Sequence, residues 1–347
     1  MTLLHERWFV DSSPFPLAWT SVTRPGALAA VGGAVVLLSL AAFVWRRTGR
    51  RPLVPGPFRL GADADSLAVL YGAIPLILAL HLSITLFVSG VTLHLFAPNL
   101  SLGEPGAVPI GSLGGAVAAL AQIAIGLALF YGALTRIATI LLVVLWLAGA
   151  MWFGPVLLLE HAIVPGIALT LYIMGRGPFA VDAMLNPRFG LPRLRWLPRA
   201  LTPLRIGTGL SLVTLAFTEK IWNLPLGLAF LERYPVNFLP EWGIPLSDES
   251  FLLAAGAVEL LAGLLLIANV YVRLGILVLW LPFNLTLAAF GWVELVGHLP
   301  VYGAMAVLAL WGQGSADDLR ALQRGLMQRP VLLPAPQARA GSREAET

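Results

Sequence analysis

Most side chains that could do chemistry inside an apolar environment lie between positions 219 and 298. Lys220 is the only lysine among 22 basic residues, and it directly follows Glu219. Glu259 lies inside an apolar run, while Glu294 and His298 are four positions apart, which places them on one face of a helix. A carboxyl, an ammonium and an imidazole in such surroundings can bind a polar group or exchange protons with it.

Each of these residues also has a structural interpretation. Lys220 can extend from a helix end to the membrane surface, Glu259 can form a buried ion pair that fixes helix packing, and His298 can bond to a carbonyl or water at a helix start. In the functional interpretation, the catalytic group is Lys220, Glu259 and His298, and the ligand contacts are Glu219, Trp222, Asn284, Trp292 and Glu294. Glu294 and His298 supply too few ligands for a metal, so we predict no metal site.

The chain that carries these residues has the composition of a membrane protein. Of its 347 residues, 58% are hydrophobic and 12% are charged, whereas soluble domains have about 25% charged residues. The net charge is +4, but the arginines occur in short clusters between apolar runs. Membrane topology explains that distribution better than nucleic-acid binding does. Because the chain has no cysteine, it forms no internal disulfide.

Nine apolar runs approach the length of about 20 residues that a helix needs to cross a bilayer. They lie at 27–45, 66–90, 114–134, 137–153, 160–175, 203–221, 251–270, 274–291 and 298–313. With nine spans, the arginine-rich connections all fall on one side, which is the cytoplasmic side by the positive-inside rule. We therefore expect an all-α integral protein of a bacterial or archaeal cytoplasmic (inner) membrane, with its N-terminus outside and its C-terminus inside.

The segments that flank these runs have simpler interpretations. Residues 314–330 are expected to form a short cytoplasmic helix with Ser315 as its N-cap. The tail from 330 to 347 has the composition of a disordered segment. The N-terminal aromatic residues are expected to anchor at the membrane interface and to do no chemistry; they are Trp8, Phe9, Phe15 and Trp19.

The chain also matches itself at a shift of 137 residues, in a register that runs without a gap from about residue 120 to 175. This repeat register places Gly126 on Gly263, Arg136 on Arg273, and His161 on His298. The predicted organisation is an N-terminal segment with the first span (1–60), a first four-helix repeat (61–175), a basic linker (176–202), a second four-helix repeat (203–313) and a C-terminal helix with its tail (314–347). Four helices are an even number, so the repeats have the same orientation.

The repeats differ in charge, which indicates where the site lies. Gln122 in the first repeat stands opposite Glu259 in the second, and the first repeat has no lysine opposite Lys220. We therefore expect the second repeat to carry an outward-facing polar pocket, beneath the loop 222–250, and the first repeat to act as scaffold.

The second repeat resembles the DoxX/DoxD-like family of four-helix membrane proteins. Its helices read RIGTGLSLVTLAFTEKIW and AVELLAGLLLIANVYVRLG, and its last helix opens with GHLP. The positions similar to the family pattern are Arg205, Gly209, Lys220, Glu259, Gly263, Arg273 and His298. The two glycines among them are expected to let helices pack closely. The first repeat matches more weakly. The resemblance implies a four-helix bundle and a link to quinone-coupled oxidation of thiosulfate or to membrane redox complexes.

Three functions are consistent with these observations. The first is a redox-associated subunit that binds a quinone or a similar lipophilic carrier and relies on a membrane or periplasmic redox partner, because the chain encodes no redox centre. The second is a non-enzymatic transporter or a protein that binds lipid or a small anion. The third is a structural subunit of a larger membrane complex.

Overall fold

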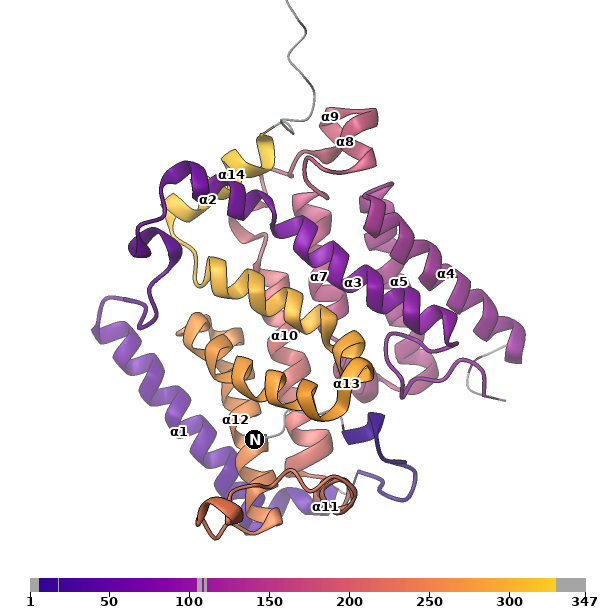
Figure 1. The fold of residues 1–347 in the computed structure, drawn as a ribbon, viewed down its shortest axis with the longest axis vertical. Coiled ribbons are helices and arrows are strands. Elements are labelled where there is room, and N and C mark those ends of the chain that lie inside the picture. Colours follow the sequence, from indigo (N-terminus) through magenta and orange to yellow (C-terminus); the bar gives the residue numbers. More distant parts are fainter. Residues whose placement is uncertain (1–5, 18, 105–107, 109–110, 329–347) are drawn as a thin grey trace, which may run out of the picture.

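The computed structural model describes residues 6–17, 19–104, 108 and 111–328, and within these residues the regular structure is helical without a β-strand. One isolated bridge joins His94 and Ser101. The long helices are arranged side by side, with the short helices α2, α8, α9 and α14 at one end of the molecule and α11 at the other (Figure 1). The predicted all-α fold is confirmed.

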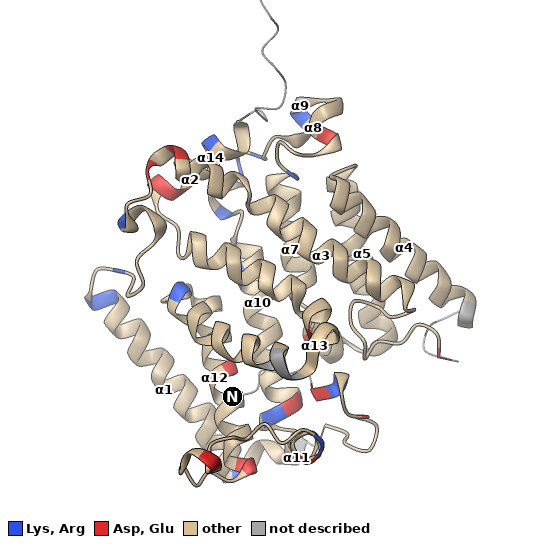
Figure 2. Ribbon diagram, viewed as in Figure 1, with Lys and Arg blue, Asp and Glu red and all other residues tan. Residues whose placement is uncertain are grey.

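Among the described residues, seven helical segments are long and apolar enough to cross a membrane. They are α1 (Pro25–Arg47), α2 with α3 (Ala64–Gly72 and Ile74–Val91), α4 (Gly111–Tyr131), α5 (Thr135–Phe153), α10 with the π-helix η5 (Thr202–Leu215 and Ala216–Ile221), α12 (Asp248–Ala268) and the second part of α13 (Val272–Trp311). The shorter apolar helices are α7 (Ile163–Met174) and the first part of α13, up to Leu285. The chain is therefore a multi-pass membrane protein, and most charged residues lie on loops and helix ends (Figure 2).

Polar caps and breaks set the bounds of these helices. Asp63 accepts hydrogen bonds from the N–H groups of Asp65 and Ser66 at the start of α2. Ser315 caps α14 (Ala316–Met327) by accepting from the N–H of Asp318, as the sequence predicted. The remaining short helices are α6 (Pro155–Leu159), α8 (Val181–Leu185), α9 (Pro187–Gly190) and α11 (Leu224–Arg233). The predicted tail 330–347 lies outside the described residues.

Glycines allow the central helices to cross closely. Helix α10 packs on both α12 and α7, and α13 packs on α3. A Cβ atom built on Gly209 or on Gly263 would lie only 2.7 Å from the carbonyl oxygen of the other, so the predicted packing role of these glycines is confirmed. Gly166 and Gly207 make the same kind of contact where α7 crosses α10. The centre of the molecule is thus the region where α3, α7, α10 and α13 meet.

Local backbone features recur in the repeat register that the sequence shows. Positive φ angles occur at both members of four pairs in this register, which are Gly132 and Asn269, Leu134 and Tyr271, Gly154 and Gly291, and Gly175 and Gly312. Arg136 donates from Nε to the carbonyl of Tyr172, and Arg273 donates from Nε to the carbonyl of Ala309. The donors and the acceptors of these two bonds match in the same register.

Candidate functional site

Lys220 is the centre of a buried cluster of charges. Its Nζ atom lies 3.2 Å from Oε1 of Glu259 on α12 and 3.8 Å from Oε1 of Glu6 in the N-terminal segment. All three side chains are almost completely buried. The structure therefore brings together Lys220 and Glu259, two of the residues that the sequence selected, and adds a carboxylate from a distant part of the chain.

The π-helical turn η5 and a glycine on α12 make room for this lysine. Thr218, Glu219 and Lys220 are consecutive in η5, and all are buried. A π-helical turn is rare and often occurs at functional sites. A Cβ atom built on Gly256 would lie 3.1 Å from Cβ of Lys220, so a larger residue there would press on the lysine.

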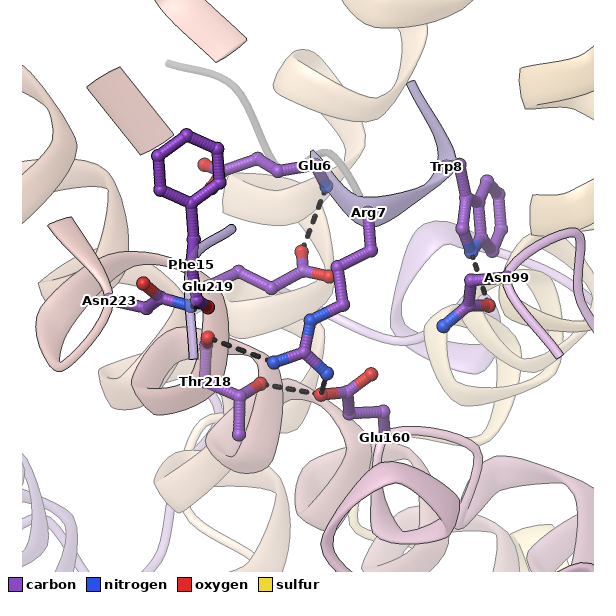
Figure 3. Close-up of polar contacts among 9 residues, drawn as sticks. All are labelled: Glu6, Arg7, Trp8, Phe15, Asn99, Glu160, Thr218, Glu219 and Asn223. Carbon is purple, nitrogen blue, oxygen red and sulfur yellow. Dashed lines mark hydrogen bonds and ion pairs between the residues drawn. The ribbon is translucent and has the colours of Figure 1, made fainter. Parts of the chain in front are cut away.

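The N-terminal segment enters this cluster through the short helix η1 (Glu6–Trp8). The backbone N–H of Glu6 donates to Oε2 of Glu219 at 3.0 Å. Arg7 donates from Nη1 to Oε1 of Glu160 at 2.6 Å and from Nη2 to the carbonyl of Thr218 at 3.3 Å (Figure 3). The hydroxyl of Thr218 donates to the same Glu160 oxygen at 2.7 Å. The segment is thus tied to the ends of two different helices.

Trp8 points from the same turn towards the other side of the site. Its Nε1 atom donates to Oδ1 of Asn99 at 3.2 Å (Figure 3), and its ring centre lies 4.7 Å from that of His298. Phe9 packs against Phe230 and other aromatic residues. These two aromatics therefore pack against residues of the bundle, and their anchoring at a membrane interface stays a prediction. The segment folds back onto the bundle, where Arg7 pairs with Glu160 and Glu6 lies 3.8 Å from Lys220.

A cavity of about 40 Å³ lies where α3, α7, α10 and α13 meet. Its polar lining comes from Thr85, Glu160, His161, Thr208, Ser211, Glu259 and His298, and Trp8 lines it as well. A cavity of about 10–15 Å³ already holds one water, so this cavity admits small polar species. The polar pocket was expected within 203–313, but residues of both predicted repeats contribute to this one.

The buried cluster has more carboxylates than cations. Among the described residues, it combines the carboxylates of Glu6, Glu160, Glu219 and Glu259 with the cations of Arg7 and Lys220. Oε2 of Glu160 and Oε2 of Glu259 accept no hydrogen bond from the described residues. Burial raises the pKa of the Glu6 carboxyl well above its ordinary value, against the opposing effect of Lys220. Because a buried carboxylate without a partner charge is costly, the cluster favours the uptake of protons or of another positive charge.

A second buried pair lies beside the cavity on α13. Nδ1 of His298 is 3.2 Å from Oε1 of Glu294, and both side chains are about 1% exposed. These residues follow the kink at Gly291, which has a φ of 68°. The predicted one-turn spacing on a helix face is observed. His161, the counterpart of His298 in the repeat register, lines the same cavity from the turn before α7.

None of the five predicted ligand residues lines this cavity: Glu219 and Glu294 lie in the charge clusters beside it, and the other three make contacts elsewhere. Trp222 stacks on Phe217 with 4.2 Å between the ring centres, and it packs with residues of α1 and α12. Asn284 is exposed and donates to the carbonyl of Trp280, one turn earlier. Trp292 is 68% exposed, so it does not stack on a ligand in this cavity.

The sequence interpretation missed several residues of the site, mainly Glu6, Arg7, Glu160 and Thr218. Glu160 carried one usable signal, since it directly precedes His161 at the start of an apolar run. Glu6 and Arg7 lie in a segment without apolar periodicity, so nothing in their local sequence indicates burial.

The comparison with protein-family models and the searches of curated proteins and of solved structures gave no match. The resemblance to the DoxX/DoxD-like family therefore stays a prediction, and the functional argument rests on the geometry of the site.

Proposed function

We propose that this protein is a redox-associated membrane subunit that binds the head group of a quinone-class carrier in the central cavity and exchanges protons with it. The observation that carries the proposal is the excess of buried carboxylates beside a cavity that two histidines also line. The proton-exchanging groups are Glu259, His298 and Glu160. Lys220 stabilises the negative charge of Glu259 after this residue has given up its proton.

The proposed architecture is one added helix followed by two parallel four-helix repeats of the DoxX-like type, with nine spans in total. The seven long and two shorter apolar helices support this count. The positive φ angles and the arginine bonds that recur in the repeat register support a duplication. The arginine-rich connections support an N-terminus outside the cytoplasmic membrane.

The chemistry follows from the requirements of quinone reduction. Reduction of a quinone to a quinol takes up two electrons and two protons, one proton on each ring oxygen. A redox partner protein supplies the electrons. Glu259 and His298 supply the protons from within the cavity, and each is then reprotonated through the polar groups of the cluster. The reverse reaction releases the same two electrons and two protons.

Binding of a ring requires more room than the cavity provides. Trp8 lines the cavity and lies against His298. It also contacts Gly297 so closely that a Cβ atom built there would lie 2.2 Å from the indole. In this proposal a quinone head group takes the place of the Trp8 indole and stacks on the same histidine.

Binding of a quinone analogue to the purified protein in lipid nanodiscs tests the proposal. We expect saturable binding that Glu259→Gln weakens by at least tenfold and that Trp292→Ala, at an exposed position, leaves unchanged. The proposal is overturned if neither the wild type nor Trp8→Ala binds any analogue. It is also overturned if Glu259→Gln and Trp292→Ala weaken binding equally.

The charge excess also favours a second candidate, a non-enzymatic carrier of protons or small cations. The sequence left open a small-anion ligand, but a cluster with four carboxylates and two cations attracts positive charge rather than negative charge. Proton or cation flux in proteoliposomes without any redox partner, abolished by Glu259→Gln, would favour this candidate. A purely structural subunit would instead tolerate that substitution.

A further inference from the structure

Another polar pocket lies near the C-terminal end of α12, at Ala268. The Lys220 cluster, which includes Glu259, lies closer to the N-terminal end of this helix. The volume of the pocket is about 230 Å³. The loop after α1 forms one side, and the segment between α13 and α14 forms the other. Three arginines line it, Arg50, Arg59 and Arg273, against one acidic residue, Asp318. The pocket therefore carries an excess of positive charge.

Arg273 gives the pocket a fixed cation. Its Nε and Nη2 atoms donate to the carbonyls of Ala309 and Leu310, each at 2.7 Å. Cβ atoms built on Gly56 and Gly312 would lie 2.6 Å and 2.7 Å from the guanidinium group, so the chain encloses it from two sides. Both hydrogen bonds go to neutral acceptors. Its charge is therefore not cancelled by an ion pair with a described residue.

Arg50 and Arg59 add two exposed cations to the rim. Arg50 has a φ of 61°, in the left-handed region that glycine and asparagine adopt most easily. Its N–H donates to the carbonyl of Trp45 at 2.8 Å, which turns the chain back over the end of α1. A glycine would make this turn with less strain, so the turn itself does not require the arginine side chain.

The pocket lies at the level where apolar helices end. The apolar helix α1 ends at Arg47, α12 ends at Ala268 and α13 begins at Val272. Trp45, which also lines the pocket, packs edge-on against Tyr271 with 5.0 Å between the ring centres. Ends of membrane-spanning helices lie near the lipid head groups, and basic pockets there bind anionic lipids.

We propose that this pocket binds the phosphodiester head group of an anionic phospholipid. Arginine guanidinium groups form paired, charge-assisted hydrogen bonds to phosphate oxygens. Three arginines and one aspartate leave an excess of two positive charges for the phosphate. The pocket volume is many times the minimum for one water molecule, about 10–15 Å³, so it accepts a group of several heavy atoms. This site is separate from the proposed quinone site and does not depend on it.

Lipid retention by the full chain tests the proposal. The protein is placed in nanodiscs of phosphatidylcholine with a small fraction of phosphatidylglycerol, and bound lipid is measured by native mass spectrometry after extraction. We expect phosphatidylglycerol to be enriched on the wild type and its retention to fall at least tenfold in the double variant Arg50→Gly, Arg59→Gln. Arg50→Gly removes the backbone strain of an arginine with a φ of 61°, so the unfolding midpoint of the double variant should not fall.

The control is Arg188→Gln, which removes an exposed arginine on α9. It should leave retention of phosphatidylglycerol unchanged. Equal losses in the control and in the double variant would overturn the proposal, because the effect would then be one of general charge. A further arm adds inorganic phosphate at millimolar concentration. If phosphate alone binds and phosphatidylglycerol shows no preference over phosphatidylcholine, a free phosphate rather than a lipid is the ligand, and the lipid proposal fails.

Discussion

Replacing Lys220 with methionine should destabilise the protein strongly, because it removes the cation that lies between Glu259 and Glu6. The Nζ atom is 3.2 Å from one carboxylate and 3.8 Å from the other, and all three groups are buried. Removing one partner of a buried pair costs about 3–5 kcal/mol. At about 2.1 cal/mol/K per residue, a chain of 347 residues has an unfolding entropy of about 0.7 kcal/mol/K. The unfolding midpoint should therefore fall by about 4–7 °C.

The midpoint is measured by tryptophan fluorescence in one detergent for the wild type, Lys220→Met, Glu259→Gln and the double variant. The double variant should be more stable than the sum of the two single losses predicts, because Glu259→Gln removes a charge that Lys220→Met leaves without its cation. Residues in direct contact show coupling energies of about 0.5–3 kcal/mol. Adding Glu6→Gln should recover further stability for the same reason.

The matched control is an exposed ion pair of similar geometry. Arg320 and Asp317 on α14 are 2.7 Å apart, with side chains 70% and 67% exposed. Exposed pairs contribute about 0–1 kcal/mol, so Arg320→Met should change the midpoint by about 1 °C or less. The reasoning is refuted if Lys220→Met lowers the unfolding midpoint by no more than Arg320→Met does, and if the shifts of Lys220→Met and Glu259→Gln add up in the double variant. The cluster would then not stabilise the fold.

Three further perturbations test other parts of the structure. Trp8→Ala should strengthen binding of a quinone analogue, measured by equilibrium titration, because it removes the indole that lines the cavity; weaker binding would contradict a competing role for this ring. The pKa of Glu6 in the docked segment is raised above its ordinary value of 4.5, which means that docking favours the protonated carboxyl. Docking of the N-terminal segment is therefore strongest below pH 4.5 and weakens as the pH rises through the raised pKa of Glu6. Hydrogen exchange of residues 6–17, corrected for its intrinsic rate, should then accelerate with pH, and an unchanged profile in Glu6→Gln would argue against this assignment. Gly263→Ala should cost about 1–3 kcal/mol, because its Cβ would meet the carbonyl of Gly209 at 2.7 Å, whereas Gly275→Ala, with nothing within 4 Å, should be neutral or mildly stabilising in the same thermal assay.

The helices were largely predictable because a bilayer imposes a simple requirement on the sequence. A spanning helix needs about 20 apolar residues, and each of the predicted runs coincides with apolar helix in the structure. The differences arise at breaks that hydropathy does not report. Gly154, with a φ of 90°, and Pro155 start a separate short helix before α7, so α7 begins at Ile163. The runs 274–291 and 298–313 form two helices that meet at a break at Gly291, so the second apolar helix starts near Phe290 rather than at 298.

The site was predictable only where a charge stands out from an apolar background. Lys220 and Glu259 met that condition, and the structure places them in contact. Asn284 and Trp292 were predicted as ligand contacts, but position along the chain does not fix the direction of a side chain on a helix that is apolar on all sides. Arg7 gave no local signal at all, because its partner Glu160 lies 153 residues away and only the folded chain brings them together.

The unequal charges of the two predicted repeats have a physical basis in how each polar residue is satisfied. Gln122 accepts from the N–H of Phe96 and donates to the carbonyls of Leu86 and His94. A carboxylate there could not donate to either carbonyl, so this position suits a neutral amide. At the matching position of the repeat register, Glu259 instead faces Lys220.

The helix that faces Gln122 supplies no lysine, and Gln122 bonds instead to backbone groups of Phe96, Leu86 and His94. In the first predicted repeat, an amide with neutral partners thus stands where the second has a glutamate that faces a lysine. The first still contributes Glu160 and His161 to the cavity from the turn before α7. The proposed proton exchange should therefore depend on both halves and on the N-terminal segment, although only the second half holds the buried lysine.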